Sequence, residues 1–139
     1  MEERLRQAVM DRLKDGQLPC NQAHAIAKLE GIDPLDLGFA LNEMGIRVSR
    51  CQLGLFGYGP KAEGKHKIVE PVEEVPERLA ERLQAAARDG AMTCQAVWAI
   101  ADGLGLKRIA VSSAMEAMGL RTSHCQLACF PRPWVPWKE

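Results

Sequence analysis

The sequence lacks a net charge, a long hydrophobic run and a secretory leader. Its 18 basic residues balance 18 acidic ones, which argues against a histone-like polyanion binder but leaves room for a local basic face. There is no run of 18 apolar residues, so no membrane-spanning helix is predicted. The acidic start, Met1-Glu2-Glu3, is unlike the basic start of a signal peptide. These absences predict a cytoplasmic protein.

The motifs of common enzyme classes are also missing. The sequence has no glycine-rich phosphate loop, no serine nucleophile elbow, no zinc-protease helix and no paired-carboxylate site. The glycine-dense segment 54–59 precedes no helix that could receive a phosphate, and it is better interpreted as a wing tip or a turn. We therefore expect neither an enzyme nor a bound cofactor.

The five cysteines include no CxxC pair, the spacing common in structural zinc sites. In a reducing cytoplasm thiols are expected rather than disulfides, and small buried hydrophobic residues are their simplest role. The alternative is a thiol or metal sensor, in which a helix start lowers the pKa of Cys20 and zinc is bound by Cys20, His24 and Cys51. The spacing Cys125-x-x-x-Cys129 is a weak signal by itself.

What the sequence does contain is an internal duplication. Residues 5–57 (copy one) match residues 79–131 (copy two) without a gap, and about a third of the paired positions are identical, as expected for two copies of one folding unit. A unit of about 50 residues is close to the size below which a lone core becomes marginal. The copies are therefore expected to pack on each other or on a second chain.

Apolar spacing predicts three helices in each copy. In copy one they cover about 3–14, 19–30 and 34–44, and in copy two their counterparts begin after Pro76, at Thr93 and at Arg108. An alternating segment after the third helix predicts a short strand or wing. The predicted domains are 1–57 for the first unit, 58–76 for a polar linker, 77–131 for the second unit and 132–139 for a proline and tryptophan tail lying across the surface.

The centre of each copy resembles the two-helix core of helix-turn-helix DNA-binding domains. In that core a small residue lets the helices approach, a glycine accepts the turn, and aliphatic residues lock the second helix onto the first. The matching positions are Ala27, Gly31, Ile32 and Leu37 in copy one and Ala101, Gly105, Leu106 and Val111 in copy two. The resemblance implies a mainly α fold with two tandem tri-helical helix-turn-helix-like repeats, each followed by a short strand or wing. It also implies binding of double-stranded DNA and transcription regulation, although tri-helical units also serve as protein-interaction modules.

Copy two is expected to be the main DNA reader. Its third helix opens with Lys107-Arg108, where copy one has Asp33-Pro34. A cationic start opposes the helix dipole but suits a nearby phosphate, although both cations could equally be solvated surface charges. The residues expected to be exposed toward base edges are Ser112, Ser113 and Glu116.

Arg47 and Arg121 follow the third helix in both copies and suit phosphate contacts, with a structural bond inside each unit as the alternative. Copy one, with Phe39 on its third helix, is expected to serve packing or dimerisation. A homodimer would present two reading helices about one DNA turn apart. The alternative function is a protein-interaction or assembly module, in which Phe39 and the tryptophan tail bind a protein partner.

Overall fold

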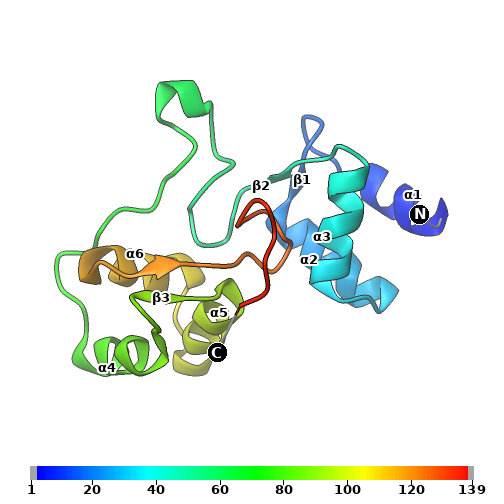
Figure 1. Ribbon diagram of the computed structural model, residues 1–139. Coiled ribbons are helices and arrows are strands. Elements are labelled where there is room, and N and C mark those ends of the chain that lie inside the picture. The colour runs from blue at the N-terminus through cyan, green and yellow to red at the C-terminus, as the bar shows by residue number, and fades with distance from the viewer. Residues whose placement is uncertain (1–2, 138–139) are drawn as a thin grey trace.

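The computed structural model describes residues 3–137 and is mainly helical (Figure 1). Copy one contributes α1 (Glu3–Met10), β1 (Leu18–Pro19), α2 (Cys20–Glu30), α3 (Pro34–Glu43) and β2 (Val48–Ser49). The linker holds one 3₁₀ turn, η1 (Lys61–Glu63). The second half contributes α4 (Glu77–Ala86), β3 (Ala91–Met92), α5 (Cys94–Leu104), α6 (Arg108–Met118) and β4 (Arg121–Thr122). None of the helices in the described range has the length and apolarity needed to cross a membrane.

Local sequence signals set most helix ends. The side chain of Asp33 accepts the Leu35 N–H at 2.9 Å and caps α3, and Thr93 caps α5 in the same way at 3.2 Å. Gly31 ends α2 with a left-handed φ of 66°. The boundaries predicted for the second and third helices of copy one are confirmed to within one residue.

The first helix is shorter than the predicted 3–14 and ends at Met10. Lys14 and Gln17 exchange backbone hydrogen bonds of 2.7 and 3.0 Å. A tight turn therefore uses the backbone groups that a longer helix would need.

The strand after each third helix is present, but it is not part of a hairpin. β2 pairs in parallel with β1, with Leu18 opposite Val48, and β4 pairs in parallel with β3, with Ala91 opposite Arg121. Each pair joins the segment before the second helix to the segment after the third. The strand pair therefore ties the three helices of one copy together rather than projecting as a wing.

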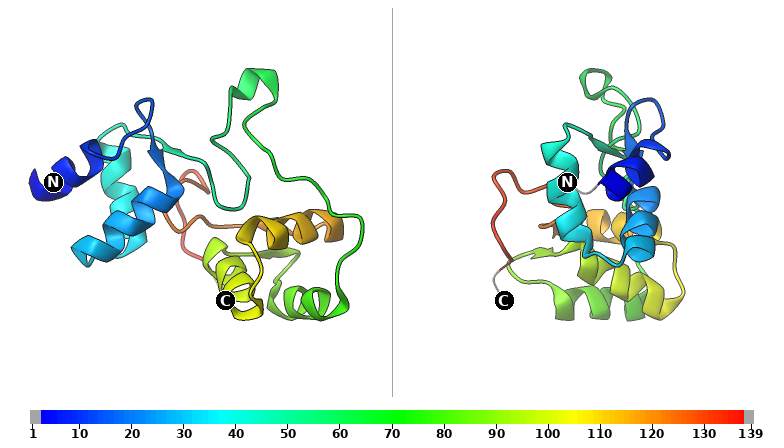
Figure 2. Two further views of the ribbon diagram at one scale, coloured as in Figure 1. Left: turned by 180° about the vertical axis from the view of Figure 1, so that it is seen from behind. Right: turned by 90° about the vertical axis from the view of Figure 1, so that its right-hand side faces the viewer.

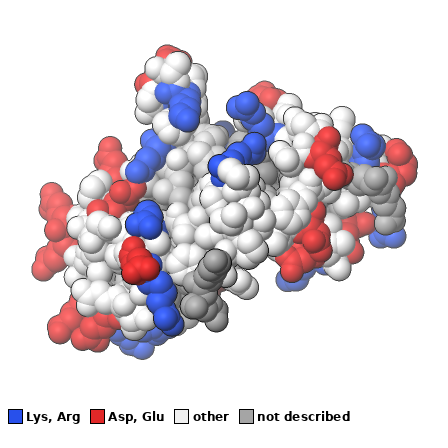
Figure 3. Space-filling model, in the orientation of Figure 1, with Lys and Arg blue, Asp and Glu red and all other residues white. Residues whose placement is uncertain are grey.

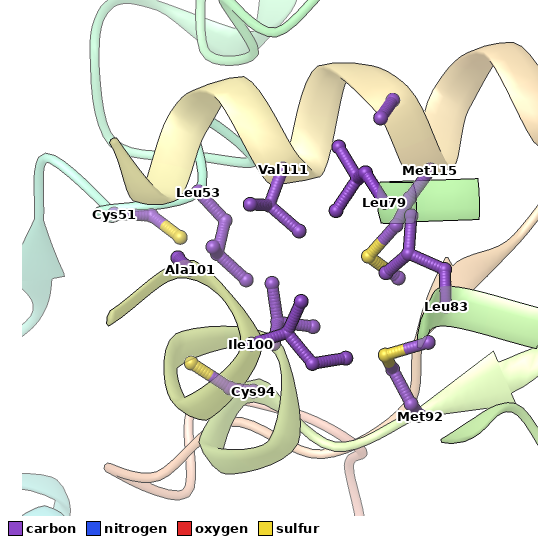
Figure 4. Packing of buried hydrophobic residues seen from close by; sticks show 12 residues of the cluster. Cys51, Leu53, Leu79, Leu83, Met92, Cys94, Ile100, Ala101, Val111 and Met115 are labelled. Carbon is purple, nitrogen blue, oxygen red and sulfur yellow. The ribbon is translucent and has the colours of Figure 1, made fainter. Parts of the chain in front are cut away.

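The two copies exchange the segment that follows this strand pair. Cys51 and Leu53 of copy one are buried among α4, α5 and α6 (Figure 4). Cys125 and Leu127 of copy two are buried among α1, α2 and α3. Each core is therefore completed by a segment of the other copy.

Equivalent positions of the two copies also contact each other. The ring centroids of His24 and its counterpart Trp98 are 4.3 Å apart, and those of Phe56 and its counterpart Phe130 are 6.2 Å apart. Contacts between matched positions are typical of a two-fold, isologous arrangement. Figure 2 shows α1–α3 on one side and α4–α6 on the other, with the arm that carries η1 projecting beyond both.

After the exchange, the linker continues over α6. The Ser113 hydroxyl donates to the carbonyl oxygen of Glu70, and the Val72 N–H donates to the Ser113 carbonyl at 3.3 Å. An ion pair of 2.5 Å joins Lys67 of the linker to Glu116 of α6. The linker therefore covers the outer face of this helix.

The tail lies over α3 in a related way. Trp134 packs edge-on against Phe39, with the ring centroids 6.0 Å apart. Trp134 and Trp137 both pack on His124, whose Nε2 lies 2.7 Å from the carbonyl oxygen of Val135. The predicted surface tail with anchored tryptophans is thereby confirmed for the described residues up to 137.

Gly38 of α3 offers a test of the exchange, with Gly103 of α5 as its control. Alanine is favoured over glycine inside a helix by about 1 kcal/mol. At position 38 a Cβ would overlap the carbonyl oxygen of Leu127, whereas at position 103 the nearest atom is a guanidinium nitrogen of Arg82 at 3.7 Å. We expect Gly103→Ala to raise the free energy of unfolding by up to about 1 kcal/mol. Gly38→Ala should lower it by about 1–3 kcal/mol, because a packed backbone must shift.

Denaturant unfolding of both variants measures these changes. If Gly38→Ala stabilised the protein as much as Gly103→Ala, the exchanged segment would not lie against α3.

Candidate anion-binding groove

The structure does not present the predicted reading face of copy two to solvent. Ser112 is 2% exposed, so the expectation that it is exposed is wrong. It occupies the position of Gly38, on the side of the third helix that packs inward. Ser113 and Glu116 are held by the linker, as described above. None of these three side chains is free to face a DNA major groove in this arrangement.

The two cations at the start of α6 have different surroundings. Lys107 is exposed. The guanidinium carbon of Arg108 lies 3.6 Å from the centre of the Trp98 ring, and its nitrogens donate to Asp102 at 3.1 and 3.3 Å. Stacking and a two-point ion pair both fix a guanidinium in place. Arg108 is therefore used for contacts inside copy two.

His24 belongs to the same cluster. Burial, and then the positive charge of Arg108, lower the pKa of His24 to about 4. Its ring is therefore neutral at pH 7 and packs on Trp98 where the two copies meet. No group of three or more His, Cys, Asp or Glu side chains within residues 3–137 is arranged to hold a metal ion. The structure thus does not bring Cys20, His24 and Cys51 together as a zinc site.

The cysteines at the starts of α2 and α5 are buried thiols. Burial raises the pKa of Cys20, and it raises that of Cys94 to about 12. The pKa lowering predicted for Cys20 at a helix start is therefore wrong, because desolvation of a buried thiolate outweighs the helix dipole. Burial likewise raises the pKa of Cys51.

An open groove of about 930 Å³ lies beside copy one. Side chains from α3, β2, the linker and the segment 127–132 line it. Five of the lining residues are cationic, namely Lys14, Arg47, Arg50, Lys61 and Arg132, whereas Asp15 is the single carboxylate among the described residues of the lining. Figure 3 shows blue side chains on both sides of the hollow below the projecting arm, and much of the red surface toward the outer ends of the molecule. A neutral protein thus carries a local basic face.

Backbone contacts position two of the groove cations, Arg50 and Arg132. Arg50 has a left-handed φ of 50°, and its N–H donates to the carbonyl oxygen of Gly57 at 3.1 Å. A Cβ on Gly57 would approach the Arg50 nitrogen to 2.6 Å, so the end of copy one can pass this close because a glycine stands there. Arg132, which also lines the groove, donates from its Nε to the carbonyl oxygen of Cys129 at 3.1 Å.

The groove cations have few partners within the protein. Within residues 3–137, none of Lys14, Arg47, Arg50 and Lys61 forms an ion pair with a carboxylate. Arg121, the counterpart of Arg47, instead donates to the carbonyl oxygen of Asp89 at 3.4 Å. The positive charge of copy one is therefore available to an external anion.

The equivalent surface of copy two is occupied by the tail. His124 stands at the position of Arg50, and both Trp134 and Trp137 pack on it. The position that is open and cationic in copy one is thus covered in copy two. Of the groove cations, only Arg47 was among the predicted site residues. The contrast between Arg50 and His124 is the sequence signal that could have pointed to the other cations.

His24 makes stability depend on pH. Between its ordinary pKa of 6.5 and its folded pKa of about 4, the unfolded chain binds a proton that the folded chain does not bind. Above pH 6.5 His24 therefore does not lower the free energy of unfolding. As the pH falls from 6.5 toward 4, protonation of the unfolded chain lowers the free energy of unfolding by a growing amount. We expect the free energy of unfolding of wild type to fall relative to His24→Gln over this window, measured by denaturant titration at each pH. A constant difference between the two proteins across the window would contradict this.

Comparison of the chain with family models, with curated proteins and with solved structures gives no match. We therefore base the function on the groove itself.

Proposed function

We propose that the protein binds double-stranded DNA through the basic groove beside copy one, and that it acts in transcription regulation. The observation that supports this is the set of five cations around one open groove with a single carboxylate among its described lining residues. Phosphate contacts from Lys and Arg release counterions and supply much of the affinity for DNA. Because the net charge is zero, this attraction is local rather than a property of the whole surface.

In this proposal one sugar–phosphate strand lies along the groove. Arg50 and Arg132 come from different segments of the chain and are positioned by the backbone contacts described above. Asn42 of α3 and Gln17 line the same groove, and their amides are of the type that reads base edges. Phosphate contacts would set the register, and these amides would supply sequence preference.

The proposal keeps the helix-turn-helix-like character of the two copies but changes its use. Ala27 and Ala101, the small residues of the resemblance, are buried, and so are Leu37 and Val111. This burial supports two tandem tri-helical units. The linker covers α6 and the tail covers part of α3, so we assign these covered faces to packing and leave only the groove side of α3 to DNA. Each chain would contribute one groove, and a homodimer would present two.

Removing two groove charges tests the proposal. We expect Arg47→Ala/Arg50→Ala to weaken binding to a labelled duplex pool by about tenfold or more, because two charge-assisted phosphate contacts are lost. The slope of log affinity against log salt should fall by about two. Fluorescence anisotropy over a salt series measures both quantities.

The matched control is Arg78→Ala/Lys107→Ala, which removes two exposed charges from the second half of the chain. Its affinity should stay within about twofold of wild type if the contacts are local. A larger loss in this control than in the groove variant would assign DNA to copy two. No salt-sensitive binding by wild type at low salt would overturn the DNA proposal.

The second candidate function is a protein-interaction module. Phe39 and Val135 remain 39% and 53% exposed near the tail, which favours an apolar contact with a partner. Phe39→Ser separates the two candidates, since it leaves the groove cations in place. Unchanged DNA affinity in this variant would agree with the groove proposal.

A further inference from the structure

Two thiols lie together in the turn that ends copy two. The Ala128 N–H donates to the carbonyl oxygen of Cys125 at 3.2 Å, and Ala128 has a left-handed φ of 58°. The Leu127 N–H donates to the sulfur of Cys125 at 3.3 Å, and the sulfur of Cys129 lies 4.0 Å from the Leu127 carbonyl oxygen. The turn therefore holds both sulfur atoms against the backbone of the same residue, Leu127.

Copy one shows that the turn does not need this second thiol. Cys51 matches Cys125, but Leu55 stands where copy two has Cys129. In both copies the N–H of the first cysteine donates to the carbonyl of the phenylalanine five residues later, at 3.2 and 3.1 Å. The same turn thus forms with leucine or with cysteine. The thiol pair is a feature of copy two that folding alone does not explain.

The pair has the properties of a reactive dithiol. The hydrogen bond from Cys129 lowers the pKa of Cys125 below that of an ordinary thiol, and the same contact raises the pKa of Cys129. Burial raises the pKa of Cys20, Cys51 and Cys94 instead. Cys125 therefore holds the most thiolate among the cysteines, and the thiolate is the nucleophile in thiol oxidation.

A small oxidant has a route to this pair. Cys129 is partly exposed and lines the groove, and Cys125 beside it is 8% exposed. We propose that Cys125 and Cys129 form an oxidation site, in which hydrogen peroxide entering through the groove converts the two thiols to an intramolecular disulfide.

The reaction has two balanced steps. The Cys125 thiolate attacks one oxygen of hydrogen peroxide, the O–O bond breaks, and the released hydroxide takes up a proton to give water and a sulfenic acid. The Cys129 sulfur then attacks the Cys125 sulfur and displaces hydroxide, which takes the Cys129 proton and leaves as the second water. The two thiols lose two electrons, and one hydrogen peroxide is reduced.

The oxidation site is independent of what the groove binds. It does touch the groove, because the carbonyl of Cys129 holds Arg132 at 3.1 Å. A test on thiol chemistry alone therefore remains valid if the protein does not bind DNA.

The test uses the full chain, reduced and then treated with hydrogen peroxide. Free thiols are alkylated after unfolding, and the protein is digested with trypsin. The peptide that starts at Thr122 contains both cysteines of the turn, and we expect it to appear unalkylated and lighter by two hydrogens. Cys51, in the same turn with leucine beside it, should stay alkylated. We expect Cys125 to lose its thiol at least about tenfold faster than Cys51, because thiolate fraction sets the rate.

Cys129→Leu gives copy two the leucine of copy one and is the control variant. Its helical circular dichroism should match wild type, since Leu55 fills the equivalent turn. We expect no disulfide in this variant. Its Cys125 should lose its thiol more slowly than in wild type, because the contact with Cys129 that lowers the pKa of Cys125 is removed, and dimedone should capture the sulfenic acid that does form. If Cys51 were oxidised as fast as Cys125 in wild type, or if Cys125 lost its thiol as fast in the variant as in wild type, the site would be disproved.

Discussion

Each hydrophobic core of this protein depends on a segment supplied by the other copy. Leu53 is fully buried among the helices of copy two, and Leu127 is buried among those of copy one. Burying one leucine contributes about 1.5–3 kcal/mol, a large share of the stability available to a unit of about 50 residues. Withdrawing either segment opens the opposite core. The two copies therefore stabilise each other and should unfold together.

The exchange also determines which surfaces stay open. The chain that leaves each exchanged segment must cross the third helix of the other copy, so the linker covers α6 and the tail covers part of α3. The two continuations differ in path. The linker forms an arm beside copy one and leaves the groove open, whereas the tail turns back onto His124. Two similar copies thereby acquire different surfaces, and the basic groove belongs to the one whose continuation projects away.

The features that could be predicted from the sequence are those that residues close together in the chain determine. The cap at Asp33, the turn at Gly31 and the bounds of the helices depend on contacts within a few positions. Ser112 is buried by chain segments that are far away in the sequence. Its polarity alone could not show this burial and suggested that the side chain is exposed. Apart from Arg47 and Arg50, the groove cations stand in separate segments, and no local pattern joins those segments. The small residues at both 38 and 112 were the available sign of close packing on the third helix.

The differences between the copies gather around one region. Arg50 of copy one is aligned with His124 of copy two. Five positions further along the same segment, Leu55 is aligned with Cys129. Because the segments are exchanged, the cationic end of copy one and the thiol turn of copy two line one groove. Neither copy alone contains both features. Duplication followed by divergence of the exchanged segments is therefore sufficient to place a thiol pair beside a basic surface, without any change to the helices that hold them.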